Sequence, residues 1–299
     1  MITSELIHKG LFAMADSSQT ENWFFGHWGA AIITTALFID LNPLSEEAKN
    51  AAISRIDKIL KSNEIIFKDE PTSKQTTESL QPLLDAIEIN INNLSSGAHG
   101  VIYGALALKA IDFLNYEIPN SYIGHICSVV KSAQNDGLLD RYWNISNYKE
   151  TNISLSQIPT FNNVYEAALF CLKNQKNLKA NQEINNKFHF FQGTKLHQIT
   201  HSHALVLLHE LGYKELAKKG IHSLRKQIAF GDLAPKGLKP HSLQKVYSPF
   251  QASFWETEAN DIHFYKLAYP VFDLFRTLNI ENNERLLEYI NPHWELLAG

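Results

Sequence analysis

The sequence predicts an all-α protein, a single large multi-helical domain over residues 1–299 with a layered or toroidal α/α arrangement and long loops. Two observations lead to this prediction. Apolar residues recur at helical spacing along most of the chain. No region shows sustained period-two alternation bounded by turn residues, so we expect no convincing sheet. With 44% hydrophobic and 19% charged residues, the chain has enough apolar material for a sizeable core.

The first predicted helices begin at recognisable residues. His27 opens an apolar helix that continues to Leu41. Ser45 is a good N-cap for the next helix, and Glu46 and Glu47 in its first turn interact favourably with the helix dipole. Periodicity predicts further helices over residues 78–91, 100–114, 119–134, 163–174, 195–211, 214–228, 262–277 and 282–290.

Four polar segments separate these helices, and none of them is decisive enough to divide the chain into domains. They are Lys68–Thr77, Asn135–Asn163, Asn177–Lys187 and Gly231–Gln251. The second and the fourth are long for structureless connections. Loops of this length often act as lids or binding loops.

The charge and the amino-terminal sequence bear on partners and location. The formal net charge of −4 gives no reason to expect a nucleic-acid partner. The amino terminus lacks the basic and then apolar layout of a signal peptide, and the apolar stretch Gly29–Leu41 is too short for a bilayer. We therefore expect a cytoplasmic protein without a membrane partner. Cys127 and Cys171 lie in apolar helical patterns and are expected to be buried free thiols.

Thirteen histidines are many for this length. Five of them stand in no partner motif and are interpreted as surface or hydrogen-bonded core residues: His8, His125, His222, His241 and His293. Others occupy unusual settings. His27 shares a helix face with small and apolar residues, where an imidazole must be hydrogen-bonded or metal-bound. His99 lies between glycines in Gly-Ala-His-Gly, which allows close approach of backbone or ligand, and Tyr103 follows one turn later.

A second group of histidines lies on the predicted helix 195–211. His197 and His201 are one turn apart on an inward face, a spacing that suits either a metal site or two hydrogen-bonded core residues. His203 falls on the other side, near Glu210, and is expected to be solvated.

His263 and Lys266 are neighbours on one face of the predicted helix 262–277. The face is apolar, and burial there would favour the neutral amine of Lys266. The alternative is a snorkelling lysine paired with Glu256 or Asp261.

The order of these motifs resembles the questin oxidase-like family, oxygenases of anthraquinones and related aromatic polyketides. A His-Trp-Gly start to an Ala-rich helix comes first, then His-Gly-Val-Ile, then Leu-His-x-x-Thr, and last Asp-x-His-x-x-Lys-Leu. The resemblance covers about residues 20–275. The chain departs from the family pattern at Gly26, where Asn is common, at Tyr103, where Arg is common, and at Ile262, where Pro is usual.

The resemblance implies an all-α oxygenase with a mononuclear non-haem iron site. Its metal ligands would be four histidines and a carboxylated lysine, which correspond here to His27, His99, His197, His263 and Lys266. Manganese and zinc are the alternative metals for imidazole and oxygen donors. Tyr103 and His201 are the candidate catalytic residues beside these ligands.

The implied partners are dioxygen and a planar aromatic or quinone-type small molecule. Its ring would stack on side chains such as Trp28, Tyr103, Phe254 or Trp255. No Gly-x-Gly-x-x-Gly fingerprint of a flavin or nicotinamide cofactor is present.

Two other functions stay open at this point. One is a metal-dependent hydrolase or lyase on an α/α scaffold, with Glu256, Glu258 or Asp261 as base. Gly-Ala-His-Gly is also similar to a motif of lanthionine cyclase-like toroids, but their cysteine zinc ligands are missing here. The other is a non-enzymatic helical protein that binds an apolar ligand, with His197 and His201 merely structural.

Overall fold

The computed structural model describes residues 2–20, 22–64, 67, 79–95, 97–137, 149–175, 182–184, 187–189, 193–232, 245–259, 261–281 and 283–298. The α-helices are α1 (Ile2–Asp16), α2 (Gly26–Leu41), α3 (Glu46–Ser62), α4 (Gln81–Asn92), α5 (His99–Phe113), α6 (Asn120–Ser132), α8 (Val164–Lys173), α9 (Gly193–Glu210), α10 (Lys214–Asp232), α11 (Ala252–Glu256), α12 (His263–Lys266), α13 (Ala268–Thr277) and α14 (Glu284–Ala298). Short 3₁₀ turns are η1 (Ser17–Thr20), η2 (Trp23–Phe25) and η3 (Ala133–Asn135).

The predicted all-α class is confirmed, and each predicted helix has a counterpart. The predicted helix 262–277 is divided at Leu267 into α12 and α13, although Leu267 itself keeps helical dihedral angles. The last helix runs on to Ala298 through Pro292, well past its predicted end. Helices α1 and α11 were not predicted.

One small β element was not predicted. Strands β1 (Gln182–Ile184) and β2 (Lys187–His189) pair antiparallel. The pair begins inside the polar segment Asn177–Lys187, which we expected to be a loop, and ends just beyond it. Two strands of three residues leave the fold class unchanged.

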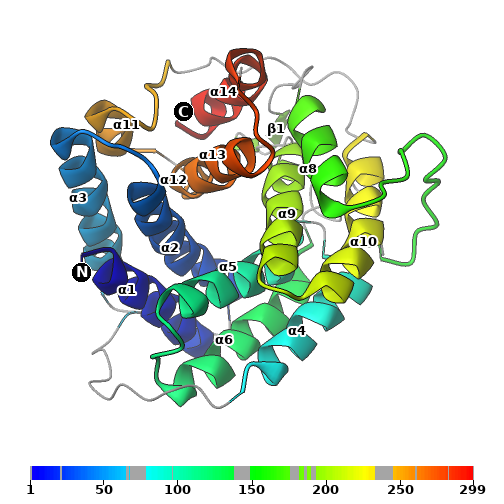
Figure 1. The fold of residues 1–299 in the computed structure, drawn as a ribbon, viewed down its shortest axis with the longest axis horizontal. Helices are drawn as coiled ribbons and strands as arrows, with labels where there is room; N and C mark the ends of the chain where they lie inside the picture. Colours follow the sequence, from blue (N-terminus) through cyan, green and yellow to red (C-terminus); the bar gives the residue numbers. More distant parts are fainter. Residues whose placement is uncertain are drawn as a thin grey trace.

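Four helical units form a closed inner ring. Helix α2 contacts α5, α5 contacts α9, α9 contacts α13, and α12 and α13 return to α2. In Figure 1 these helices stand around the middle of the molecule, although they come from distant parts of the chain. Helices α2 and α5 are buried on nearly every face, as expected for helices that are apolar all round.

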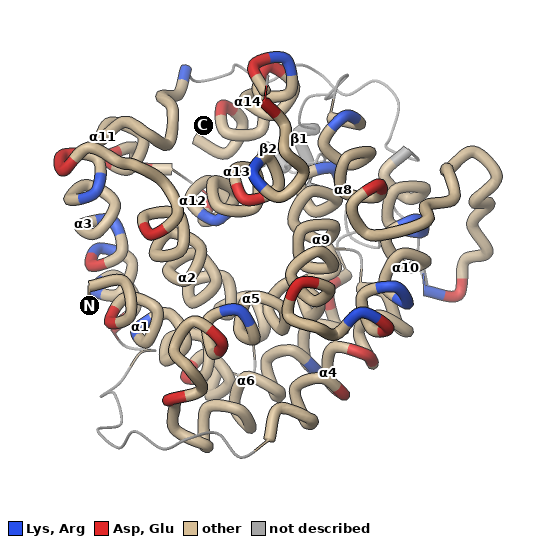
Figure 2. Tube along the Cα trace, viewed as in Figure 1, with Lys and Arg blue, Asp and Glu red and all other residues tan. Residues whose placement is uncertain are grey.

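The remaining helices cover this ring from outside. Helix α1 packs on α2, α4 and α6 pack on α5, α8 and α10 pack on α9, and α14 packs on α12. Helix α3 packs on α2 and α11. Figure 2 shows charged residues on outer helices such as α3 and α10, while α2 is almost free of them. The arrangement has the inner and outer layers of an α/α ring.

The buried side chains form one hydrophobic cluster that extends from Leu6 to Ala298. One segment, Trp23–Leu41, is long and apolar enough to span a membrane by composition, but 72% of its window is buried inside the protein. Its burial is that of a core helix. Both cysteines are buried free thiols, as predicted.

Candidate metal centre

Four histidines of the inner ring converge at one point. His27, His99, His197 and His263 are all buried, and each offers a ring nitrogen that lies within 4.8 Å of those of the other three. The Nε2 atom of His197 is 2.9 Å from that of His99 and 3.1 Å from that of His263. The Nε2 atoms of His27 and His263 are 3.0 Å apart. The predicted convergence of these four residues is thereby confirmed.

Each of the four histidines lies near the amino-terminal end of its helix. His99 and His263 are the first residues of α5 and α12, His27 is the second of α2, and His197 is in the second turn of α9. The amino-terminal ends of the four inner helical units therefore meet at this cluster. Helix amino termini carry partial positive charge, so the site favours neutral imidazoles and attracts anions.

The segment Gly97–Gly100 shows why the Gly-Ala-His-Gly motif is needed. The amide of Gly97 donates to Asp136 Oδ2 over 2.7 Å, and a Cβ at Gly97 would overlap the His99 ring. Ala98 has a left-handed backbone with φ of 57°, a strained conformation for a residue with a side chain. A Cβ at Gly100 would overlap Asn90 of α4. The motif thus brings His99 onto Asp136 and α5 onto α4.

Three of the four rings have their proton fixed on Nδ1. His27 Nδ1 lies 2.7 Å from the carbonyl oxygen of Phe24, and an oxygen of this kind can only accept. His99 Nδ1 donates to Asp136 Oδ2 over 2.9 Å. His263 Nδ1 donates to Asp261 Oδ1 over 2.6 Å. Carboxylates and carbonyls hold metal-binding histidines in this tautomer.

The Nε2 atoms of these rings consequently present lone pairs. Those of His27 and His263 are 3.0 Å apart and cannot hydrogen-bond to each other, because both are acceptors. If His197 carries its proton on Nε2, that one proton cannot form hydrogen bonds to the Nε2 lone pairs of all three other rings. A cation at the centre would accept all four lone pairs, so the chemistry of the donor set fits a metal ion.

Protonation of the imidazole rings does not explain the close contacts between their Nε2 atoms at neutral pH. Burial lowers the pKa of His99 to about 4, although Asp136 acts in the opposite direction. Burial and then the charge of Lys266 lower the pKa of His27 far below its usual value. The same two causes lower the pKa of His263.

Lys266 lies inside the protein beside this cluster, as predicted from its helix face. The residue is 1% exposed, and its Nζ has no hydrogen-bond partner among the described residues. Burial lowers its pKa to about 7, with the carboxylates of Asp261 and Asp136 acting against this. The alternative of a snorkelling lysine paired with Glu256 or Asp261 is therefore wrong.

The two candidate catalytic residues differ in their distance from the cluster. Tyr103 is fully buried, and its hydroxyl oxygen lies 2.6 Å from His27 Nδ1, where it is a second acceptor beside Phe24. His201 is also fully buried, but its Nδ1 contacts Gln227 over 3.1 Å and it is not one of the converging histidines. Burial lowers the pKa of His201 to about 4.

Some expectations for neighbouring residues were wrong. His203 is 1% exposed rather than solvated, and it bonds Asp273 over 2.9 Å, because α9 is covered on several sides as an inner helix. Phe254 and Trp255 are buried in an aromatic cluster with Phe264 and Phe38 and are closed to a substrate. His293 is a hydrogen-bonded core residue, as expected, and His241 lies outside the described residues.

Three residues of the site were missed by the sequence analysis. Asp136 lies beyond the end of α6, 37 residues after its partner His99, and no periodicity marks it. Trp23 and Phe24 of η2 cover the cluster from outside, with ring centroids 4.8 Å from His99 and 4.5 Å from His27. An aromatic pair just before His27 was the available signal.

Comparisons of the chain with protein-family models, with curated proteins and with solved structures found no match. The family resemblance therefore depends on the four motifs alone, and the geometry of the four histidines is an independent observation.

Proposed function

We propose that this protein is a metal-dependent oxygenase, with iron as the metal, of the questin oxidase-like kind. One observation carries the proposal. His27, His99 and His263 each hold their proton on Nδ1 through an acceptor, and their Nε2 lone pairs face one another or His197. A bound iron ion would supply redox chemistry with dioxygen.

The spacing of the nitrogens supports a single bound ion. Three of the Nε2–Nε2 separations are 2.9, 3.0 and 3.1 Å, and all four nitrogens lie within 4.8 Å of one another. Imidazole donors suit iron, and they also suit manganese and zinc.

Lys266 would add an anionic oxygen ligand by carboxylation. The neutral amine attacks carbon dioxide, an N–C bond forms, and one proton is released to give a carbamate. Burial supplies the neutral amine, because it lowers the pKa of Lys266 to about 7. The unpartnered Nζ and the positive helix ends at the cluster both favour an added negative charge.

The surrounding residues orient the ligands and limit solvent. Asp136 and Asp261 keep the protons of His99 and His263 on Nδ1. Trp23 and Phe24 lie over the rings and exclude bulk water. The cluster is nevertheless not sealed, because His263 keeps 7% of its surface exposed. A small molecule such as dioxygen can approach on that side.

The test is metal analysis combined with an oxygen electrode. Protein expressed with iron supplementation is expected to contain about one iron per chain. It should consume dioxygen with a planar hydroquinone or polyphenol as substrate. His99→Ala is expected to lose both properties, and His222→Ala, an exposed histidine of α10, is the matched control. High-resolution electron density at Lys266 would show the carbamate.

Each of the two alternative functions predicts a different result in these experiments. Zinc without oxygen consumption would support the hydrolase or lyase instead. Absence of any metal, together with no effect of His99→Ala, would overturn the proposal and leave the apolar-ligand-binding protein.

A further inference from the structure

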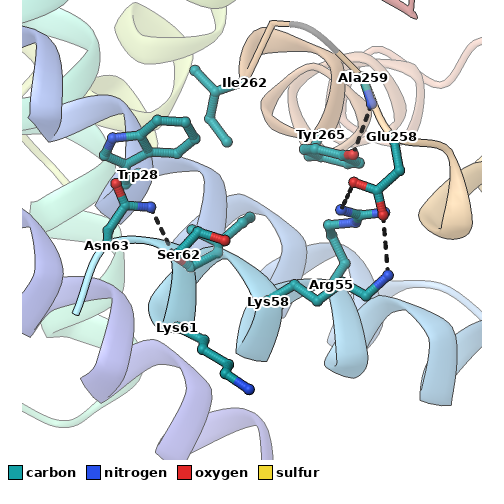
Figure 3. A pocket seen from close by; sticks show the side chains of 11 residues that line it. Trp28, Arg55, Lys58, Lys61, Ser62, Asn63, Glu258, Ala259, Ile262 and Tyr265 are labelled. Atoms are coloured by element: carbon teal, nitrogen blue, oxygen red, sulfur yellow. Dashed lines mark hydrogen bonds and ion pairs between the residues drawn. The ribbon is translucent and has the colours of Figure 1, made fainter.

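A second candidate site, a pocket, lies on the outer side of α2. A pocket of about 260 Å³ opens between the start of α2, the second half of α3 and the residues Glu258, Ala259, Ile262 and Tyr265 (Figure 3). None of the four converging histidines lines it. Its wall nevertheless includes Trp28, which follows His27, and Ile262, which precedes His263.

The walls of this pocket suit a flat ring. Trp28 and Ile262 lie on one side, and Tyr265 lies on the other (Figure 3). Ile59, which is buried, adds an aliphatic surface to the lining. Aromatic and aliphatic walls with a few polar groups are typical of small-molecule sites. Indole and phenol rings bind planar aromatic ligands by stacking or edge contact.

Arg55 makes the pocket rigid. Its guanidinium donates to the carbonyl oxygens of Trp255 and Thr257 over 2.8 and 3.0 Å and to the carboxylate of Glu258 over 3.1 Å. The guanidinium carbon also lies 4.9 Å from the centroid of the Tyr265 ring. Arg55 thereby fixes one wall in place before any ligand arrives, and its hydrogen bonds are used within the protein.

The charge of the lining is positive. Arg55, Lys58 and Lys61 oppose one carboxylate, Glu258. Hydrogen bonds from Arg55 and Lys58 lower the pKa of Glu258 to about 2, so it is ionised at neutral pH and the lining keeps a net charge of about +2. The ammonium of Lys61 forms no ion pair with any residue in the described ranges.

We propose that this pocket binds a flat aromatic anion, a carboxylate or phenolate on one or two fused rings. The ring lies between Trp28 and Tyr265, and the anionic group faces the lysines of α3. The site is separate from the metal centre and does not require a metal. Its occupant would contact residues adjacent in sequence to His27 and His263.

The first test is isothermal titration calorimetry with 2-naphthoate and its neutral analogue 2-naphthalenemethanol. We expect saturable binding of 2-naphthoate, at least tenfold tighter than that of the alcohol and weakened by salt. Equal affinity for the two compounds would overturn the assignment of an anion, and absence of binding would overturn the site.

Two pairs of variants locate the binding. Ser62→Phe places a ring in the pocket and is expected to abolish binding, whereas Ser54→Phe, an exposed serine of the same helix outside the lining, should not. The double variant Lys58→Gln, Lys61→Gln is expected to weaken binding about tenfold, against no change for the exposed Lys218→Gln of α10. Unchanged binding in both pocket variants would contradict the proposal, provided that circular dichroism shows them folded.

Metal analysis of the same samples separates this inference from the proposed function. Metal without 2-naphthoate binding would overturn the pocket proposal alone. Binding of 2-naphthoate by protein that contains no metal even after expression with iron supplementation would support the pocket and count against the oxygenase.

Discussion

His99 and His203 each pair with a buried carboxylate over 2.9 Å, yet their surroundings differ in a way that decides what each pair can do. His99 turns its other ring nitrogen toward His197, and three histidines from separate helices complete the cluster. His203 has the edge of the Tyr269 ring beside it, at 5.1 Å between centroids. Its partner Asp273 is already bonded to Arg276 over 2.6 Å.

The comparison teaches that a buried His–carboxylate pair is not in itself a sign of a metal site. At Asp273 the negative charge is balanced by a guanidinium, and the pair fastens α9 to α13. Asp136 Oδ2 instead accepts from the Gly97 amide and from His99 Nδ1, and it holds a ring whose Nε2 lone pair faces His197 in the cluster. The excess of Nε2 lone pairs, rather than the His–carboxylate contact itself, indicates a site for a cation.

The largest expected difference is in metal binding by alanine variants of the two histidines. His99→Ala should reduce metal occupancy at least tenfold, because one ligand is lost. His203→Ala should retain it and lose about 1–3 kcal/mol of stability from the broken buried hydrogen bond. Metal analysis measures the occupancy, and thermal melting with and without added iron measures the stability. A metal at 100 times its dissociation constant adds about 2.7 kcal/mol of stability.

The opposite pattern, with metal retained by His99→Ala and lost by His203→Ala, would mean that the cluster is not the site.

A smaller effect is expected from the carboxylates. Asp136→Asn should weaken metal binding about 10- to 100-fold, because the amide no longer holds the proton on His99 Nδ1 as firmly. Asp273→Asn should leave metal affinity unchanged. Competition with a coloured chelator gives the affinity of each variant. If the two variants lose metal affinity equally, Asp136 affects metal binding only through the overall stability of the protein.

The Asp273 pair should also appear in the acid stability of the protein. Burial acts to raise the pKa of Asp273, but bonding to His203 and Arg276 holds it at about 2, below its ordinary value near 3.8. A depressed carboxylate pKa gives stability that is present above pH 4 and lost as the pH falls to about 2. The loss amounts to about 2 kcal/mol. Urea unfolding of wild type and Asp273→Asn at pH 5, 4 and 3 should show their difference shrinking toward low pH; a constant difference would refute the assignment.

The smallest effect is expected at Tyr103. Tyr103→Phe removes one of two acceptors at His27 Nδ1, and the carbonyl of Phe24 still holds the proton. Metal affinity should therefore fall less than about threefold. If turnover nevertheless falls strongly while metal content is unchanged, Tyr103 acts on the substrate rather than on the ligand.

Most helices, though not α1 and α11, were predictable because they depend on local patterns. The same patterns marked His27, His99, His197 and His263 as inward-facing, but only the family resemblance favoured His197 over His201. Period 3.6 marks the helices, and the small residues around His27 and His99 mark buried faces. Asp136 was not predictable, since its partner is 37 residues away and its role depends on how the segment after α6 returns to α5. His203 was placed in solvent because helical periodicity alone cannot show that α9 is covered on more than one side.

The ring has a consequence for folding. The histidines that touch at the cluster are 66, 98 and 236 residues apart in sequence. An ion held by all four would join the first and last of them and close a loop of 236 residues, as a reversible cross-link. Closing so long a loop removes much of the freedom of the unfolded chain. No short fragment would bind the ion, and metal release would report the opening of the entire ring.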